Sequence, residues 1–96
     1  MTLQEFKTTI GQGKPPEKIN PLLQSLWFDA KGDWEAAHNI AQDINSDDGS
    51  WVHAYLHRKE DDSGNASYWY HKAKRKMPSY DLSKEWDEIV TYFLSA

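Results

Sequence analysis

Apolar residues recur three and four positions apart along almost the whole chain, a spacing that puts them on one side of an α-helix. The last segment is the clearest case, because Leu82, Trp86, Ile89 and Phe93 follow one another in steps of four, three and four. Strand signals are nearly absent, since the chain has only two valines and no run that alternates apolar with polar residues. The pattern therefore predicts an all-α protein.

Capping residues and helix breakers divide the chain into six predicted helices. Thr2 with Glu5 three residues later is a capping-box pattern, and Asn20 before Pro21 is typical of a helix start. Glycine and proline clusters mark the ends of the first two helices. Four helices are predicted to start at Thr2, Asn20, Asp33 and Asp81. Another is predicted to start near Ser50, after a loop over residues 45–49. The remaining one carries the segment Ala66 to Ala73 and follows a break at residues 61–64.

Short turns join the four middle helices, and short turns force neighbouring helices to run antiparallel. No linker is long enough to separate two domains. We therefore expect residues 1–96 to form a single domain of two antiparallel helical hairpins, with one helix before them and one after.

The two predicted hairpins match each other at an offset of 29 residues. Ser25 pairs with Ala54, and Ala37 pairs with Ala66. In each copy a small residue on the first helix is followed twelve positions later by an alanine on the second. Two helices approach closely where both side chains are small, so this register predicts a tight contact within each pair.

This register resembles the tetratricopeptide repeat and its Sel1-like relative over roughly residues 20 to 78. The segment from Ala66 to Ala73, with its Trp-Tyr pair and Lys-Ala end, looks much like the second helix of a Sel1-type repeat. The resemblance implies a protein-interaction module in which the first helix of each pair lines a concave groove. Carried over by position, the groove residues would be Trp51, Tyr55 and Arg58.

Charge and composition exclude several classes of function. The formal net charge is −4, which disfavours binding to the phosphate backbone of a nucleic acid. The one basic stretch, residues 72–76, closes a predicted helix, where cations complement the helix dipole. No apolar run approaches the length of a membrane span, and the N-terminus lacks the pattern of a signal peptide. The absence of cysteine removes thiol chemistry and fits a reducing compartment, so we expect a cytoplasmic protein without membrane or nucleic-acid partners.

Histidines provide the only metal-like spacings. His53 and His57 stand four apart on one helix, a spacing that can present two imidazoles to one Zn²⁺, with Glu60 or Asp61 as a third ligand. Ala54 replaces the glutamate that a zinc protease needs after its first histidine. The structural alternative is that one imidazole forms a hydrogen bond between packed helices and the other faces water. Because that alternative is favoured, no cofactor is predicted.

Two further patterns involve His38. Glu35 and His38 form a Glu-x-x-His motif, but di-iron bundles need two such motifs and two more glutamates. Trp34 lies one turn from His38, and the two would form an aromatic pocket with Trp51 or His53 if the hairpins stack. No nucleophilic triad and no phosphate-binding glycine loop are recognisable, which leans against an enzyme.

Three hypotheses follow. The first is a non-enzymatic helical-repeat module that binds a protein or peptide. The second is a small-ligand or metal-binding protein, with enzymatic activity left open. The third is a homodimer that hides tryptophans the monomer cannot bury. The first uses the face with Trp51, Tyr55, His57 and Arg58, and the second uses the cleft with Trp34, His38, His53 and His57.

Overall fold

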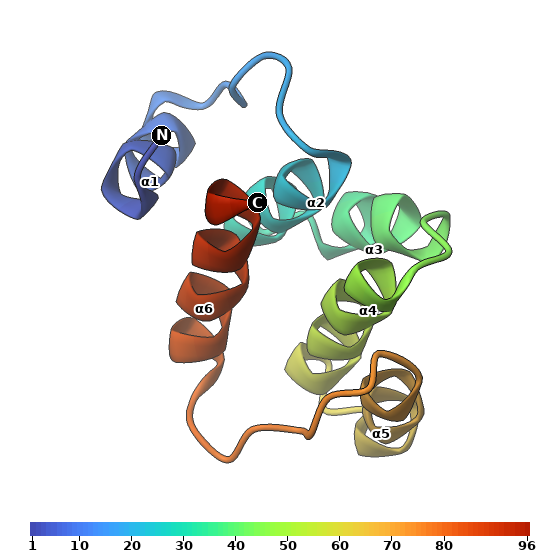
Figure 1. The fold of residues 1–96 in the computed structure, drawn as a ribbon. Coiled ribbons are helices and arrows are strands. Elements are labelled where there is room, and N and C mark those ends of the chain that lie inside the picture. The colour runs from blue at the N-terminus through green and yellow to red at the C-terminus, as the bar shows by residue number, and fades with distance from the viewer.

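The computed structural model describes residues 1–96 and contains six α-helices and no strand, which confirms the all-α prediction (Figure 1). The third to fifth helices follow one another down one side of the molecule, and the last helix returns beside them to the centre. The helices are α1 (Leu3–Gln12), α2 (Pro21–Ala30), α3 (Trp34–Gln42), α4 (Asp47–Lys59), α5 (Ser63–Lys72) and α6 (Leu82–Ser95).

Most helix starts lie where the sequence predicts them. Thr2 and Glu5 form the predicted capping box, and Asn20 and Asp81 accept from backbone N–H groups in the first turns of α2 and α6. The start predicted near Ser50 is wrong. Ser46 caps α4 instead, because its hydroxyl accepts from the Gly49 N–H at 3.0 Å, so the presumed loop is the first helical turn.

Gly49 lies in that first turn because the backbone before α4 passes very close to it. A Cβ atom at this position would lie 2.1 Å from the carbonyl oxygen of Ile44. No side chain fits that gap, whereas Gly64 in the first turn of α5 has open space where its Cβ would be. The close approach fixes how α3 leads into α4.

The turn between α2 and α3 and the turn between α4 and α5 have similar backbone conformations. Gly32 and Asp61 both have positive φ, 86° and 61°. The following residues, Asp33 and Asp62, cap α3 and α5 with nearly equal angles, φ −101° and −103° with ψ 74° in both. Each also donates its backbone N–H at 2.9 Å to the carbonyl five residues earlier. The offset of 29 thus corresponds to a repeated turn.

The small residues of the predicted register lie in the core. The four residues Ser25, Ala37, Ala54 and Ala66 are all fully buried. In the first copy the Ser25 hydroxyl donates to the Ala37 carbonyl at 2.7 Å, which ties α2 to α3. The most extensive contacts between helices are those of α4 with α5 and of α2 with α3, as the predicted pairs require. Membership of the repeat family stays a prediction.

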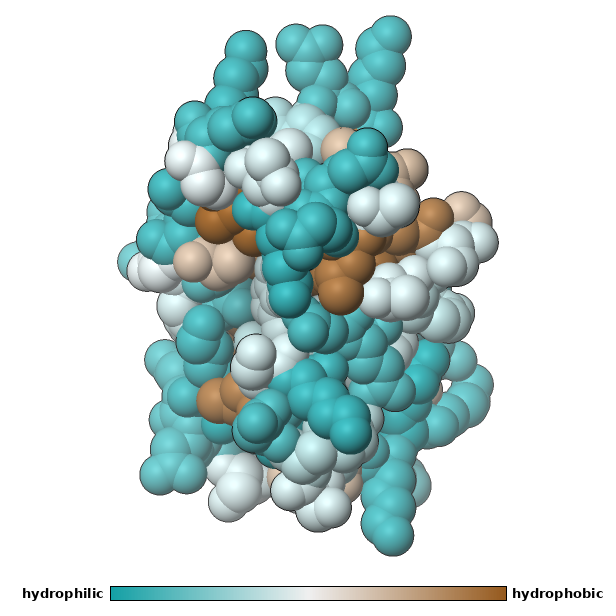
Figure 2. Space-filling view, turned by 90° about the vertical axis from the view of Figure 1, so that its left-hand side faces the viewer, coloured by the Kyte–Doolittle hydropathy of each residue, from teal (hydrophilic) through white to brown (hydrophobic).

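The tryptophans are accommodated within one copy of the chain. Trp27, Trp51 and Trp86 are buried, and Trp34 and Trp69 are half-buried. On the face that carries α1 and α6, hydrophilic side chains interrupt the apolar patches (Figure 2). The observation that suggested a homodimer is therefore absent, and a dimer stays a prediction without that support.

A buried carboxylate joins α4, α5 and α6. Glu85 on α6 is fully buried and accepts from the Tyr70 hydroxyl at 2.6 and 2.7 Å and from the Arg58 guanidinium at 2.8 Å. The Trp51 indole N–H also donates to it, at 3.3 Å. Burial, followed by the hydrogen bond to this carboxylate and its negative charge, raises the pKa of Tyr70, so the phenol stays a donor.

The contact at Gly49 predicts opposite effects for two glycine substitutions. Gly49→Ala should lower the free energy of unfolding by about 1–3 kcal/mol, because the methyl group overlaps backbone that cannot move aside cheaply. Gly64→Ala should leave it unchanged or raise it by up to about 1 kcal/mol, because alanine is the better helix former. Urea unfolding followed by circular dichroism measures both, and equal effects would contradict the close approach.

The Glu85 carboxylate predicts a large loss of stability. Glu85→Ala should lower the free energy of unfolding by about 3–5 kcal/mol, because it leaves the Arg58 charge without its buried partner. Glu88→Ala removes an exposed carboxylate one turn along α6 and should cost less than about 1 kcal/mol. Chemical unfolding of both variants tests this. Similar losses in the free energy of unfolding would show that the buried carboxylate of Glu85 contributes no more than an exposed one.

Candidate metal centre

Three histidines from two helices converge between α3 and α4. His38 lies on α3, and His53 and His57 lie one turn apart on α4. One ring nitrogen from each can be chosen so that all three lie within 4.8 Å of one another. The nearest pair is the Nε2 atom of His38 and the Nε2 atom of His53, at 3.0 Å. The packing of α3 on α4 produces this convergence.

Two tryptophans hold the imidazole rings in place. Trp34 stacks on His38 with centroids 4.7 Å apart and an interplanar angle of 14°. Its indole N–H donates to the Leu56 carbonyl of α4 at 2.8 Å, so the indole itself is anchored. Trp69 of α5 stacks on His53 at 4.0 Å and 24°. These contacts restrict the rotation of the His38 and His53 rings, whereas neither indole stacks on His57.

The environment keeps the two closest imidazoles neutral. Burial, followed by the charges of His38, His57 and Lys72, lowers the pKa of His53 to about 4. Burial and the charge of His57 also lower the pKa of His38, against a smaller opposing effect of Glu60. A neutral imidazole has one nitrogen with a free lone pair, the form that binds metal ions. At neutral pH one of the two rings carries its hydrogen on Nε2 and donates a hydrogen bond to the Nε2 atom of the other.

His57 has an unpaired nitrogen inside the protein. Its Nδ1 atom is buried and has no hydrogen-bond partner. A carboxylate oxygen of Asp62, the residue that caps α5, lies 3.8 Å from it, too far for a hydrogen bond. Carboxylates commonly orient the histidines that bind metals by accepting from their second nitrogen. Asp62 is in position to do so after a small shift of the ring.

The distances approach those of a metal site. Zinc binds imidazole nitrogen at about 2.0–2.1 Å, which puts two nitrogens of a tetrahedral site about 3.4 Å apart. The pair formed by His38 and His53 is slightly closer than this, at 3.0 Å, and the widest pair in the group is 4.8 Å apart. Small ring rotations would bring the three nitrogens to the spacing of a bound ion, and the His57 side chain, which is 13% exposed, has no indole stacked on it.

The structure separates the predicted site residues into two groups on opposite sides of α4. Trp51, Tyr55 and Arg58 follow steps of four and three, so they share one side of the helix. His53 is two positions from Trp51 and from Tyr55, which is about 200° around a helix. The histidines therefore face α3 and α5, and the other three side chains face α2 and α6.

The predicted groove residues do not share one groove, since Trp51, Tyr55 and Arg58 each border a different hollow. Trp51 and Tyr55 are only 3% and 2% exposed, so that prediction is wrong. Their polar atoms bond inward, the Trp51 indole to Glu85 and the Tyr55 hydroxyl to Asp29 at 3.1 Å. Arg58 also bonds inward, to Glu85 and to the Tyr80 carbonyl. A protein or peptide partner that uses another surface stays a prediction.

The histidines have partly different neighbours in the structure from those that the sequence predicts. His38 completes the group with His53 and His57, a place expected for Glu60 or Asp61. Glu35 is exposed and lies outside the group, so the Glu-x-x-His motif contributes only its histidine. Of the two predicted pocket partners of Trp34 and His38, His53 is present and Trp51 is not. Sequence reasoning missed Trp69, which the structure stacks on His53.

No family of proteins, curated protein or solved structure matches the chain. None of the six helices combines the length and apolar character that a membrane crossing requires. The geometry of the histidine cluster is thus the main guide to function.

The lowered pKa of His53 predicts that acid destabilises the metal-free protein. Unfolded His53 takes up a proton near its ordinary pKa of 6.5, whereas folded His53 resists it down to about pH 4. Stability is therefore complete above pH 6.5 and falls as the pH drops from 6.5 toward 4. Urea unfolding in the presence of a chelator at pH 7.5 and 5 measures the loss.

Two substitutions test whether His53 causes that loss. His53→Gln keeps a side-chain hydrogen-bonding group but cannot be protonated, so it should lose less stability over this range. His71→Gln, an exposed position on α5, should keep the wild-type pH dependence. If wild type and His53→Gln lost the same free energy of unfolding between pH 7.5 and 5, His53 would not be the cause of the loss.

Proposed function

We propose that the protein binds one divalent transition metal ion of the zinc, copper or nickel type through His38, His53 and His57. The convergence of three imidazoles from α3 and α4 carries the proposal. Surface histidines that meet by chance would be protonated or hydrogen-bonded to water. Here two nitrogens face each other at 3.0 Å, and a third histidine has a buried nitrogen without a partner.

The chemistry of the ligands selects the ion. Imidazole nitrogen suits zinc, copper and nickel, whereas magnesium and calcium need oxygen ligands. No carboxylate belongs to the group of three. Three protein ligands leave one position of a tetrahedral ion for water or an anion, as in catalytic zinc sites. Trp34 and Trp69 supply an apolar surround that limits the access of water.

Metal titration of the chelator-treated protein tests the proposal. Isothermal calorimetry with Zn²⁺ should give one site per chain. His57→Ala and His53→Ala should each weaken affinity about tenfold or more, because two imidazoles hold a divalent ion far less tightly than three. His71→Ala removes the fourth histidine, which lies outside the group, and should leave affinity unchanged.

Tryptophan fluorescence provides an independent readout. Cu²⁺ quenches nearby indoles, and Trp34 and Trp69 stack directly on two of the proposed ligands. Saturable quenching by Cu²⁺ should disappear in His53→Ala, with folding checked by circular dichroism, and persist in His71→Ala. No heat and no quenching at millimolar metal, or equal loss in the His71 variant, would overturn the proposal.

A further inference from the structure

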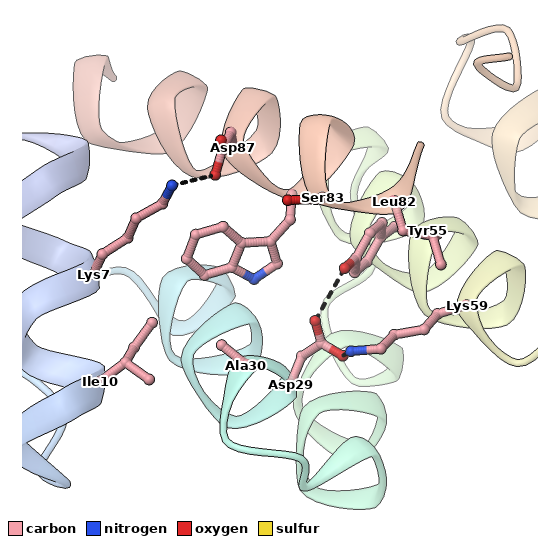
Figure 3. Close-up of a pocket in the computed structure, with 10 residues that line it drawn as sticks. Lys7, Ile10, Asp29, Ala30, Tyr55, Lys59, Leu82, Ser83 and Asp87 are labelled. Atoms are coloured by element: carbon pink, nitrogen blue, oxygen red, sulfur yellow. Dashed lines mark hydrogen bonds and ion pairs between the residues drawn. The ribbon is translucent and has the colours of Figure 1, made fainter. Parts of the chain in front are cut away.

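A hollow lies on the opposite side of α4 from the histidines. It has a volume of about 470 Å³ and is bounded by α1, α2, α4 and α6 (Figure 3). Small-molecule sites usually have volumes of roughly 300–1,000 Å³. None of the three histidines lines it, so it is independent of the proposed metal site. We refer to it as the α1–α4 cleft.

One part of the cleft is apolar and already ordered. Ile10 of α1 and Leu82 and Trp86 of α6 contribute to its lining. The Trp86 indole N–H donates to the Leu26 carbonyl of α2 at 3.1 Å, and its ring contacts Phe6 at a centroid distance of 5.9 Å. These contacts fix the ring, so an apolar ligand would meet a rigid aromatic surface with little ordering cost.

The buried acid at the cleft is already satisfied. Asp29, whose side chain is only 1% exposed, accepts from the Tyr55 hydroxyl at 3.1 Å and from the Lys59 ammonium at 2.8 Å. Both of its oxygens are therefore occupied by groups from α4. Asp29 holds Lys59 in place at the cleft and is not itself presented to a ligand (Figure 3).

The unused hydrogen-bonding capacity of the cleft consists mainly of donors. Lys59 is 39% exposed and uses one of its three N–H donors on Asp29. Lys7 is 41% exposed and forms an ion pair with Asp87, with Nζ and Oδ1 3.1 Å apart. A third ammonium, that of Lys31, lies beside the cleft, where it donates to the Ile10 carbonyl at 3.4 Å. Asp87 is the one partly exposed acid there, and Lys7 offsets its charge.

We propose that the α1–α4 cleft binds a small organic carboxylate with an apolar or aromatic body. The body lies against Trp86, Ile10 and Leu82, and the carboxylate accepts from the Lys59 ammonium. Lys59 is the better of the two lysines for this role because a buried partner positions it, whereas Lys7 pairs with an exposed one. The ligand contacts α1, α4 and α6, so it would also hold α1 against the rest of the fold.

Three compounds that differ only in their polar group test the charge preference. They are 3-phenylpropionate, 3-phenylpropan-1-ol and 3-phenylpropylamine, each titrated to about 10 mM, the range for fragment-sized ligands. The chain is treated with chelator, so the metal proposal plays no part in the outcome. The NMR signal of the Trp86 indole N–H should shift saturably with the carboxylate, and the alcohol and amine should bind about three- to tenfold more weakly.

A paired substitution tests the role of Lys59. Asp29→Asn combined with Lys59→Met removes both charges together, so no buried carboxylate is left without its partner, and the amide still accepts from Tyr55. This variant should lose the preference for the carboxylate over the alcohol. Lys14→Met removes an exposed lysine that does not line the cleft and should keep that preference.

Three results would overturn the proposal. The alcohol or the amine could bind wild type as tightly as the carboxylate does, or the paired variant could keep the preference. The third is the absence of any ligand-induced shift at Trp86.

Discussion

The carboxylate of Glu85 determines how α4 is turned about its own axis. It has no contact with water and accepts from three side chains that come from two other helices, Trp51 and Arg58 of α4 and Tyr70 of α5. A buried charge is tolerated only when its hydrogen bonds are complete and well aligned. The donors must therefore stay on the side of α4 that faces α6. Asp29 of α2 imposes the same constraint, because it accepts hydrogen bonds from Tyr55 and Lys59 of α4.

The orientation of the histidines follows from that constraint. When Trp51, Tyr55 and Arg58 are held toward α2 and α6, His53 and His57 must face α3 and α5. There they meet His38 and the two tryptophan rings. The two sides of α4 thus bury polar groups in different ways. The two acids accept hydrogen bonds from basic and hydroxyl groups on one side of the helix. On the other side His53 stays neutral, because burial and the nearby imidazoles disfavour a positive charge there.

The fold was predictable where local chemistry decides it, and the site only in part. Helix caps and the spacing of apolar residues are properties of short segments, which is why Thr2, Asn20 and Asp81 were found. Ser46 was missed because its neighbours Asn45, Asp47 and Asp48 have the composition of a loop, although acidic residues also favour a first helical turn. The separation of His53 and His57 from Trp51 and Tyr55 was readable from helical spacing. The meeting with His38 was not, since it depends on how α3 packs against α4.

The position of the histidine cluster gives a bound ion a structural consequence as well as a chemical one. His38 belongs to the helix pair formed by α2 and α3, and His53 and His57 belong to the pair formed by α4 and α5. An ion held by all three would join the pairs at a place where only edge-to-face ring contacts and one imidazole hydrogen bond now connect these side chains. A ligand that binds the folded chain alone adds its binding free energy to stability. That stabilisation would act on the contact between α3 and α4, because the hydrogen bonds of Glu85 and Asp29 already hold the opposite side of α4.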